Sequence, residues 1–312
     1  MKKVVVIAIG GNSIIRAGQR GTIVEQFENV NKTSEQIVSL YQLGYDVVIT
    51  HGNGPQVGAM LLRSELASSQ VYSEPLDVCV ADTQGSMGYM LQQSIQNILQ
   101  QNGVNVGIAT VITQVVVDKL DPNFQKPNKP VGPFYTKEEA EIKIKEFDWK
   151  MVEDAARGYR RVVPSPIPIR IVEEEFIKSA IEKDYIVIAV GGGGIPVVYD
   201  DKKLTGVEAV IDKDRATSLL ANRLKADIFV ISTDADNVYL NYKKHDQIKL
   251  EKVKLDEIKK FYSEGHFPPG NMGPKIEAAI NFLENGGQEV IITSPELLVE
   301  AVQGKAGTKI IN

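Results

Sequence analysis

Cysteine, histidine and long apolar segments are scarce in this chain of 312 residues. The single cysteine, Cys79, excludes an intramolecular disulfide and a zinc site built on cysteines, and three histidines argue against a multi-histidine metal site. No apolar segment approaches the roughly 18 residues that a bilayer crossing requires. We therefore expect no metal-binding residue set and no membrane partner, and a cytoplasmic location with a reducing environment.

Excess positive charge is also missing, because 35 Lys and Arg face 40 Asp and Glu and the net charge is −5. This balance argues against a nucleic-acid partner. The chain has no Gly-x-x-x-x-Gly-Lys-Ser/Thr motif, which excludes a P-loop enzyme. The run Gly191–Gly194 is a poor match to a dinucleotide-binding fingerprint, because Pro196 stands where the third glycine is needed. An anion bound here has to be held by local lysines and backbone dipoles.

Among the motifs that the sequence does contain, two glycine-rich turns are the most informative. The apolar segments 4–9 and 47–50 end in Gly10-Gly11-Asn12 and in His51-Gly52-Asn53-Gly54. Apolar runs without polar alternation are typical of strands buried on both faces, and glycines let backbone N–H groups approach an anion closely. A single such turn is commonly a tight connection and no more; two with matching chemistry predict the floor of a phosphate-like site.

Strand and helix patterns alternate along most of the chain. We predict strands at 4–9, 46–50, 106–109 continuing through 110–113, 186–190, 228–232 and 289–293, and helices at 27–43, 84–101, 174–182, 214–224 and 274–284. This order predicts an α/β fold, a three-layer α/β/α sandwich around a mostly parallel central sheet. Ligands of such sheets bind at the carboxyl ends of the strands, where the glycine turns lie.

One region interrupts the alternation. Seven of the 14 prolines lie between Pro122 and Pro168, and a charged helical stretch separates them. We predict a small protruding subdomain at about 117–169, which could form a flap over the site. The glycine cluster at 191–194 then opens a second half of the chain.

Three lysines lie at rigid junctions among Gly, Pro and Asp: Lys129, Lys213 and Lys275. The sequence Asp212-Lys213-Asp214 follows an apolar segment and could hold two lysines around one carboxylate. Phosphoryl transfer needs chiefly positioning and positive charge on the migrating group. These lysines therefore predict a phosphoryl-transfer site that needs no general base.

Other segments favour a nucleotide site. The segment from Asp234 to Tyr242 follows a predicted strand and has the character of a nucleotide-side turn, and the proline-rich loop that ends in Met272-Gly273 could cover an adenine. His51 precedes the second glycine turn, and its role stays open between an acid or base and an orienting hydrogen bond.

Taken together, these motifs resemble those of carbamate kinases in the amino-acid kinase superfamily. The segments that carry the resemblance appear in order from residue 3 to about 308: Gly10–Asn12, His51–Gly58, Lys129–Phe134, Arg160–Pro166, Gly191–Gly194, Gly206–Asp214 and Met272–Lys275. The segments at Lys129 and at Arg160 distinguish this member from acetylglutamate and glutamate kinases.

The resemblance implies the reversible, Mg²⁺-dependent reaction of ATP and carbamate to ADP and carbamoyl phosphate, run toward ATP in arginine breakdown as is usual for the family. It implies that Lys129, Lys213, Asp214 and Lys275 are catalytic: Lys129 reaches in from the protruding subdomain, and Lys213 and Lys275 neutralise the phosphates. Asp214 is implied to organise the lysines. Residues implied to hold carbamate and the phosphoryl group are Gly10, Gly11, Asn12, Gly52, Asn53 and Gly54; those implied to border the nucleotide are Asp234, Tyr242, Met272 and Gly273. It further implies one domain over 1–312, with a substrate half at 1–190 and a nucleotide half at 191–312, and a homodimer joined through the first half.

Two alternatives remain. Another kinase that forms an acyl phosphate on the same fold would need a patch for a larger carboxylate substrate, and we find none in the sequence. A nucleotide-binding sensor without catalysis would be favoured by loss of the lysines or of Asp214, all of which are present.

Overall fold

The computed structural model describes residues 2–16, 18–154, 157–268 and 270–312, without the side chain of Asn12. Its main sheet has eight strands. In spatial order they are β15 (Lys252–Lys254), β17 (Thr308–Ile311), β16 (Glu289–Thr293), β12 (Ile228–Ser232), β1 (Lys3–Ile9), β2 (Tyr45–His51), β9 (Ile186–Ile188) and β3 (Ile108–Thr110). The six strands from β16 to β3 are parallel, and β17 pairs antiparallel with β16. The predicted mostly parallel sheet is confirmed.

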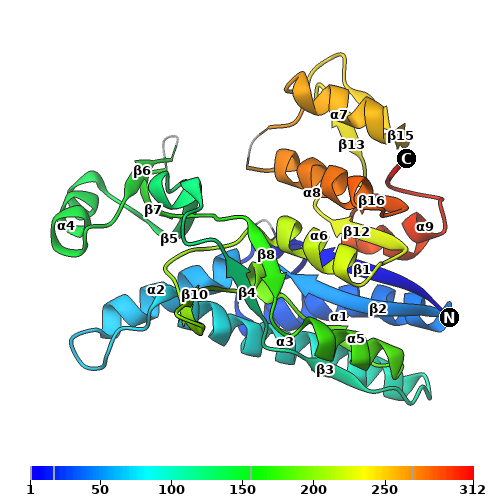
Figure 1. Ribbon diagram of the computed structural model, residues 1–312, viewed down its shortest axis with the longest axis horizontal. Coiled ribbons are helices and arrows are strands. Elements are labelled where there is room, and N and C mark those ends of the chain that lie inside the picture. The colour runs from blue at the N-terminus through cyan, green and yellow to red at the C-terminus, as the bar shows by residue number, and fades with distance from the viewer. Residues whose placement is uncertain (1, 17, 155–156, 269) are drawn as a thin grey trace.

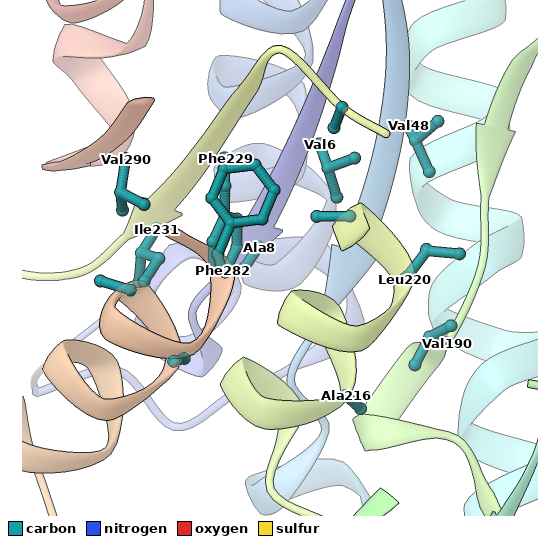
Figure 2. Close-up of a cluster of buried hydrophobic side chains, with 14 of the residues drawn as sticks. Val6, Ala8, Val48, Val190, Ala216, Leu220, Phe229, Ile231, Phe282 and Val290 are labelled. Carbon is teal, nitrogen blue, oxygen red and sulfur yellow. The ribbon is translucent and has the colours of Figure 1, made fainter. Parts of the chain in front are cut away.

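Helices cover both faces of this sheet, because alternate side chains of the strands are buried on opposite sides. One face packs Val5, Ile7 and Ile9 against α1 (Ile23–Gln42), α3 (Leu76–Gln101) and α9 (Leu298–Val302). The other packs against α5 (Glu174–Glu182), α6 (Lys213–Arg223), α7 (Leu255–Ser263) and α8 (Met272–Glu284). Figure 2 shows this second core, where Phe229 of β12 meets Phe282 of α8 with ring centroids 5.6 Å apart. The three-layer α/β/α sandwich is confirmed.

Two expected strands end differently from the prediction. The strand predicted through 106–113 is divided: β3 ends at Thr110, and the Thr113 N–H donates to the side chain of Gln84 at 2.7 Å. The chain then enters β4 in another sheet, whose order is β11 (Lys203–Gly206), β10 (Ile195–Asp200), β4 (Gln114–Val117) and β8 (Pro168–Ile171). The strand predicted at 186–190 stops at Ile188, because Val190 adopts a left-handed conformation with φ 53°.

A small antiparallel sheet lies apart from the main body (Figure 1). It consists of β5 (Lys129–Tyr135), β7 (Tyr159–Val163) and β6 (Met151–Glu153), with α4 (Lys137–Phe147) inserted between β5 and β6. Strand β5 contacts α2 (Gly54–Ala67), a helix that follows the second glycine turn. The region from 117 to 169 therefore supplies this small sheet and, at its end, β8 of the second sheet.

A hairpin of β13 (Val238–Leu240) and β14 (Ile248–Leu250) completes the strands of the described residues. None of the helices in the described ranges combines the length and the apolar character that a bilayer crossing needs.

The carboxyl ends of β1, β2 and β12 lie side by side, since Ile9 is paired with His51 and Ala8 with Ile231. The loops that follow these three strands therefore meet at one edge of the sheet.

Candidate active site

The glycine turns after β1 and β2 pack directly against each other and against the next strand. A Cβ on Gly10 would lie 2.9 Å from the carbonyl oxygen of Ser232, and one on Gly52 would lie 3.2 Å from Cδ of Lys213 and 3.4 Å from the Gly11 nitrogen. The Gly52 N–H donates to the carbonyl of Ile9 at 2.9 Å. Because these glycines have no side chains, the two turns and the aliphatic part of Lys213 can pack closely together. The backbone of Asn12 lies in the short 3-10 turn Gly11–Ser13, and its side chain lies outside the described part of the structure.

Asn53 and the glycine cluster of the second half form the floor beside these turns. Asn53 is buried, and its Nδ2 donates to Oγ1 of Thr83 at 2.8 Å. A Cβ on Gly192 would lie 2.3 Å from that same Nδ2. Asn53 is the N-cap residue of α2, but its side chain makes no capping hydrogen bond. The first turn of α2, which begins at Gly54, therefore keeps N–H groups available for an anion.

The lysines of α6 and α8 converge on one carboxylate. Nζ of Lys213 lies 2.5 Å from Oδ1 of Asp214, and Nζ of Lys275 lies 3.0 Å from Oδ2. The side chains are 13%, 4% and 13% exposed for Lys213, Asp214 and Lys275. The structure thus brings together three of the four predicted catalytic residues, as two buried ammonium groups around one carboxylate.

Burial and pairing act in opposite directions on the Asp214–Lys213 pair. Desolvation alone would raise the pKa of Asp214, but the charges and hydrogen bonds of Lys213 and Lys275 outweigh it and hold that pKa well below its usual range. Desolvation lowers the pKa of Lys213, and Asp214 opposes that shift. The cluster carries a net charge of about +1 when all three groups are ionised, which suits a site for phosphate oxygens.

Lys129 reaches the same region from the small sheet. It lies at the start of β5, and its Nζ is 2.8 Å from Oδ2 of Asp212. The other oxygen, Oδ1 of Asp212, accepts from the N–H groups of Asp214 and Arg215 and so caps α6. Burial would raise the pKa of Asp212, but Lys129 and its hydrogen bond hold it below the usual value. Sequence reasoning missed this role of Asp212, although an Asp just before a helix is a capping signal.

His51 lies beneath the glycine turns and is completely buried. Its Nδ1 lies 3.2 Å from the carbonyl oxygen of Gly52, whereas Nε2 has no hydrogen-bond partner among the described residues and faces Gly191. Desolvation lowers the pKa of His51 to about 4, and the charge of Lys213 adds to the effect. The imidazole is therefore neutral at pH 7.

A cavity of about 770 Å³ opens between the small sheet and α8. Its walls include Lys129, Asp212 and Gly273, together with the aromatic rings of Tyr262 and Phe267. Of the four residues expected to border a nucleotide, Gly273 is the one found among the described lining residues. Met272 is the neighbouring first residue of α8.

The remaining two residues expected at the nucleotide lie along the segment between β12 and β14. Asp234 is exposed in the loop after β12. Tyr242 is 50% exposed, and its ring centroid is 5.8 Å from that of Tyr239. Neither residue is among the described residues lining the 770 Å³ cavity.

Comparisons with known proteins identify the family to which this chain belongs. The Amino acid kinase family matches residues 3–294. The carbamate kinase of Thermococcus kodakarensis is 53% identical over 99% of both chains, and that of Pyrococcus furiosus is 50% identical over the whole of both. The solved structure of carbamate kinase from Giardia lamblia bound to AMP-PNP superposes with a TM-score of 0.95 at 46% identity, covering 99% of this chain and 98% of the other. The chain therefore belongs to the amino acid kinase family and, within it, to the carbamate kinases, which are phosphotransferases.

Proposed function

We propose that this protein catalyses the reversible transfer of a phosphoryl group between ATP and carbamate, giving ADP and carbamoyl phosphate. The observation that carries the proposal is the buried cluster of Lys213, Lys275 and Asp214 beside two glycine turns. Carbamate is small and planar, so it suits backbone N–H donors better than a deep apolar pocket. Phosphoryl transfer depends on alignment of the reactants and on neutralisation of their charge. In this proposal the glycine turns align the substrates and the lysines neutralise the charge.

In this proposal the two walls of the site have separate tasks. The residues that hold carbamate and the migrating phosphoryl group are Gly10, Gly11, Asn12, Gly52, Asn53 and Gly54. Lys213 and Lys275 neutralise phosphate oxygens, Asp214 keeps their ammonium groups in place, and Lys129 approaches from the small sheet. His51, neutral and buried, orients the turn at Gly52 through its Nδ1 contact.

The nucleotide is proposed to occupy the side of the site formed by residues 191–312, bordered by Asp234, Tyr242, Met272 and Gly273. The relative bound to AMP-PNP, an ATP analogue, supports a nucleotide site on this fold. We propose that Mg²⁺ arrives as the complex with ATP or ADP, because this ion keeps several waters and is commonly held through substrate phosphates. The carboxylates nearest the site, those of Asp212 and Asp214, are already paired with lysines, which is consistent with binding of Mg²⁺ through the nucleotide phosphates.

The direction of the reaction, the compartment and the oligomeric state are further parts of the proposal. An acyl phosphate transfers its phosphoryl group readily, so we propose net formation of ATP from carbamoyl phosphate, as in arginine breakdown in the cytoplasm. We also propose a homodimer joined through residues 1–190. The exposed side chains of Val78 and Tyr89 on α3 support such an interface, and sedimentation velocity tests it.

The decisive experiment measures ATP formation from ADP, Mg²⁺ and carbamoyl phosphate by the wild type, Lys213→Ala and Lys129→Ala. We expect fast turnover by the wild type, a collapse in Lys213→Ala and a weaker rate in Lys129→Ala. A folded wild type that binds ADP but shows no turnover would overturn the proposal. It would favour a different acyl phosphate or a nucleotide sensor.

A further inference from the structure

The helices α6 and α8, which supply Lys213 and Lys275, are joined along their length by polar side chains. Nε and Nη2 of Arg215 donate to the two carboxylate oxygens of Glu277 at 3.0 and 2.9 Å. Further along, Oγ of Ser218 and Nδ2 of Asn222 both donate to Oδ1 of Asn281, at 2.9 and 3.3 Å. We call these five residues the α6–α8 polar seam.

The spacing of the polar seam follows the helix period. Its members on α6 are three and four residues apart, and its two members on α8 are four apart, so each set occupies one face of its helix. The apolar faces of the same helices turn to the main sheet, where Leu220 and Ile276 are buried. Figure 1 shows α6 and α8 lying beside each other above the sheet. The seam is thus a polar contact between the two helices, separate from the Lys275–Asp214 ion pair near the start of both.

The position of α8 along α6 matters for the lysine cluster. Lys213 is two residues before Arg215, and Lys275 is two residues before Glu277. Since a helix rises about 1.5 Å per residue, a shift of one residue would carry Lys275 out of its 3.0 Å contact with Asp214. Apolar contacts tolerate small slides, whereas a bidentate guanidinium–carboxylate pair has a fixed geometry.

We propose that Arg215 and Glu277 are positioning residues of the active site. Their bidentate pair sets the register of α6 against α8 and so brings Lys213 and Lys275 to the same carboxylate. Oγ1 of Thr217 lies 2.7 Å from Oγ1 of Thr50 on β2, which fixes α6 on the sheet. The Arg215–Glu277 pair then fixes α8 with respect to α6.

A direct role in binding is the competing explanation, because Arg215 and Glu277 also line the 770 Å³ cavity. The two explanations predict different kinetics. Loss of a nucleotide contact raises KM for ADP, whereas loss of alignment lowers kcat with KM little changed. This kinetic comparison rests on the proposed function; the position of the lysines can be tested without it.

The first test measures the lysines themselves. Wild type, Arg215→Gln, Glu277→Gln and the double variant are treated with an amine-specific acylating reagent, and the labelling rates of Lys213 and Lys275 are followed by mass spectrometry. We expect each variant to raise both labelling rates about fivefold, the upper end of the factor for losing a partly exposed ion pair. Unchanged labelling in folded variants overturns the proposal, whether or not the protein catalyses the proposed reaction.

The second test measures kcat and KM with ADP and carbamoyl phosphate. We expect kcat to fall about five- to tenfold in each single variant, with no further fall in the double variant because the two residues act as one unit. Lys259→Gln is the matched control, since Lys259 pairs with Glu284 of the same helix α8 at 2.6 Å, away from the lysine cluster. Its kcat should stay at the wild-type value.

Further outcomes are distinguishable. A higher KM for ADP with unchanged kcat overturns positioning and indicates direct contact. An inactive wild type with faster labelling in the variants refutes the proposed function while supporting the positioning role. If Arg215→Gln does not fold, Arg215→Lys replaces it, because it keeps the charge and loses the bidentate geometry; it should show the same changes in labelling.

Discussion

The two walls of the active site achieve a fixed geometry by different means. The first wall, formed by the two glycine turns and the adjoining glycine cluster at 191–194, has little side-chain volume. Neighbouring backbone fills the space that a Cβ would need at Gly10 and Gly193. The opposite wall, on α6 and α8, holds buried charges, and its geometry depends on the ion pairs of Asp214. The first wall should therefore be sensitive to added volume, and the second to lost charge.

The largest effect is expected from removing the carboxylate at the centre of the charged wall. Asp214→Asn removes the carboxylate that Lys213 and Lys275 share, so two buried ammonium groups lose their partner. We expect the free energy of unfolding to fall by about 3–5 kcal/mol, measured by urea denaturation. The control Glu284→Gln breaks an exposed pair with Lys259 and should cost less than about 1 kcal/mol. Equal losses in both variants would contradict the importance of the buried cluster.

The next largest effect is expected from adding a side chain to the glycine wall. Gly193 has φ +93°, and a Cβ there would lie 2.3 Å from the carbonyl oxygen of Ile211. Gly193→Ala should lower the free energy of unfolding by about 3 kcal/mol through backbone strain and overpacking, as thermal and chemical denaturation would show. In contrast, Gly85 is helical and a Cβ on it would meet nothing within 4 Å. Gly85→Ala should be neutral or stabilise by up to about 1 kcal/mol, and a reversed order would refute this prediction.

A smaller effect tests the neutral histidine beneath the glycine wall. The pKa of His51 is about 4 in the folded protein, below its ordinary 6.5. Below pH 6.5 the unfolded chain binds a proton that the folded chain does not, so stability is lost as pH falls from 6.5 toward 4. This loss should amount to about 2 kcal/mol between pH 7 and pH 5. The test is chemical denaturation of the wild type and of His51→Asn at both pH values. The decrease in the free energy of unfolding between pH 7 and pH 5 should be smaller in the variant by that amount. An equal decrease in both proteins would mean that His51 does not titrate as described.

The smallest effect on stability concerns Lys129. Its side chain is 36% exposed, so its pair with Asp212 is partly open to solvent, and Lys129→Met should change the free energy of unfolding by less than about 1 kcal/mol. ATP formation should nevertheless weaken, because the variant loses a charge at the site. Circular dichroism melting beside the turnover assay separates the two quantities. A large loss of stability would mean that Lys129 is mainly a structural residue.

Much of the central sheet was predictable because its strands are continuous apolar runs that end in glycine or polar residues. The segments 228–232 and 289–293 are strands with the predicted bounds, and 174–182 is the predicted helix. Four-residue strands such as β17 carry too little pattern to be recognised alone. Helix α2 was missed because it begins with Gly54-Pro55, a pair that also indicates a turn.

The site was predictable where local chemistry was unusual. Lysines at rigid junctions and the sequence Asp212-Lys213-Asp214 indicated two ammonium groups around one carboxylate, the arrangement that the structure has at Asp214. Arg215 and Glu277 gave no such signal, because charged residues at helical spacing are typical of solvated surfaces. Their pairing joins residues 62 positions apart, and only the fold brings them together.

The two oxygens of Asp212 have different partners, one capping α6 and the other holding Lys129. An anion that recruits Lys129 must compete with this carboxylate and approach it as a like charge. Part of the attraction for the anion is spent on separating the pair, and the pair re-forms when the anion departs. The arrangement therefore lowers the affinity for the anion and favours a short residence time and rapid release.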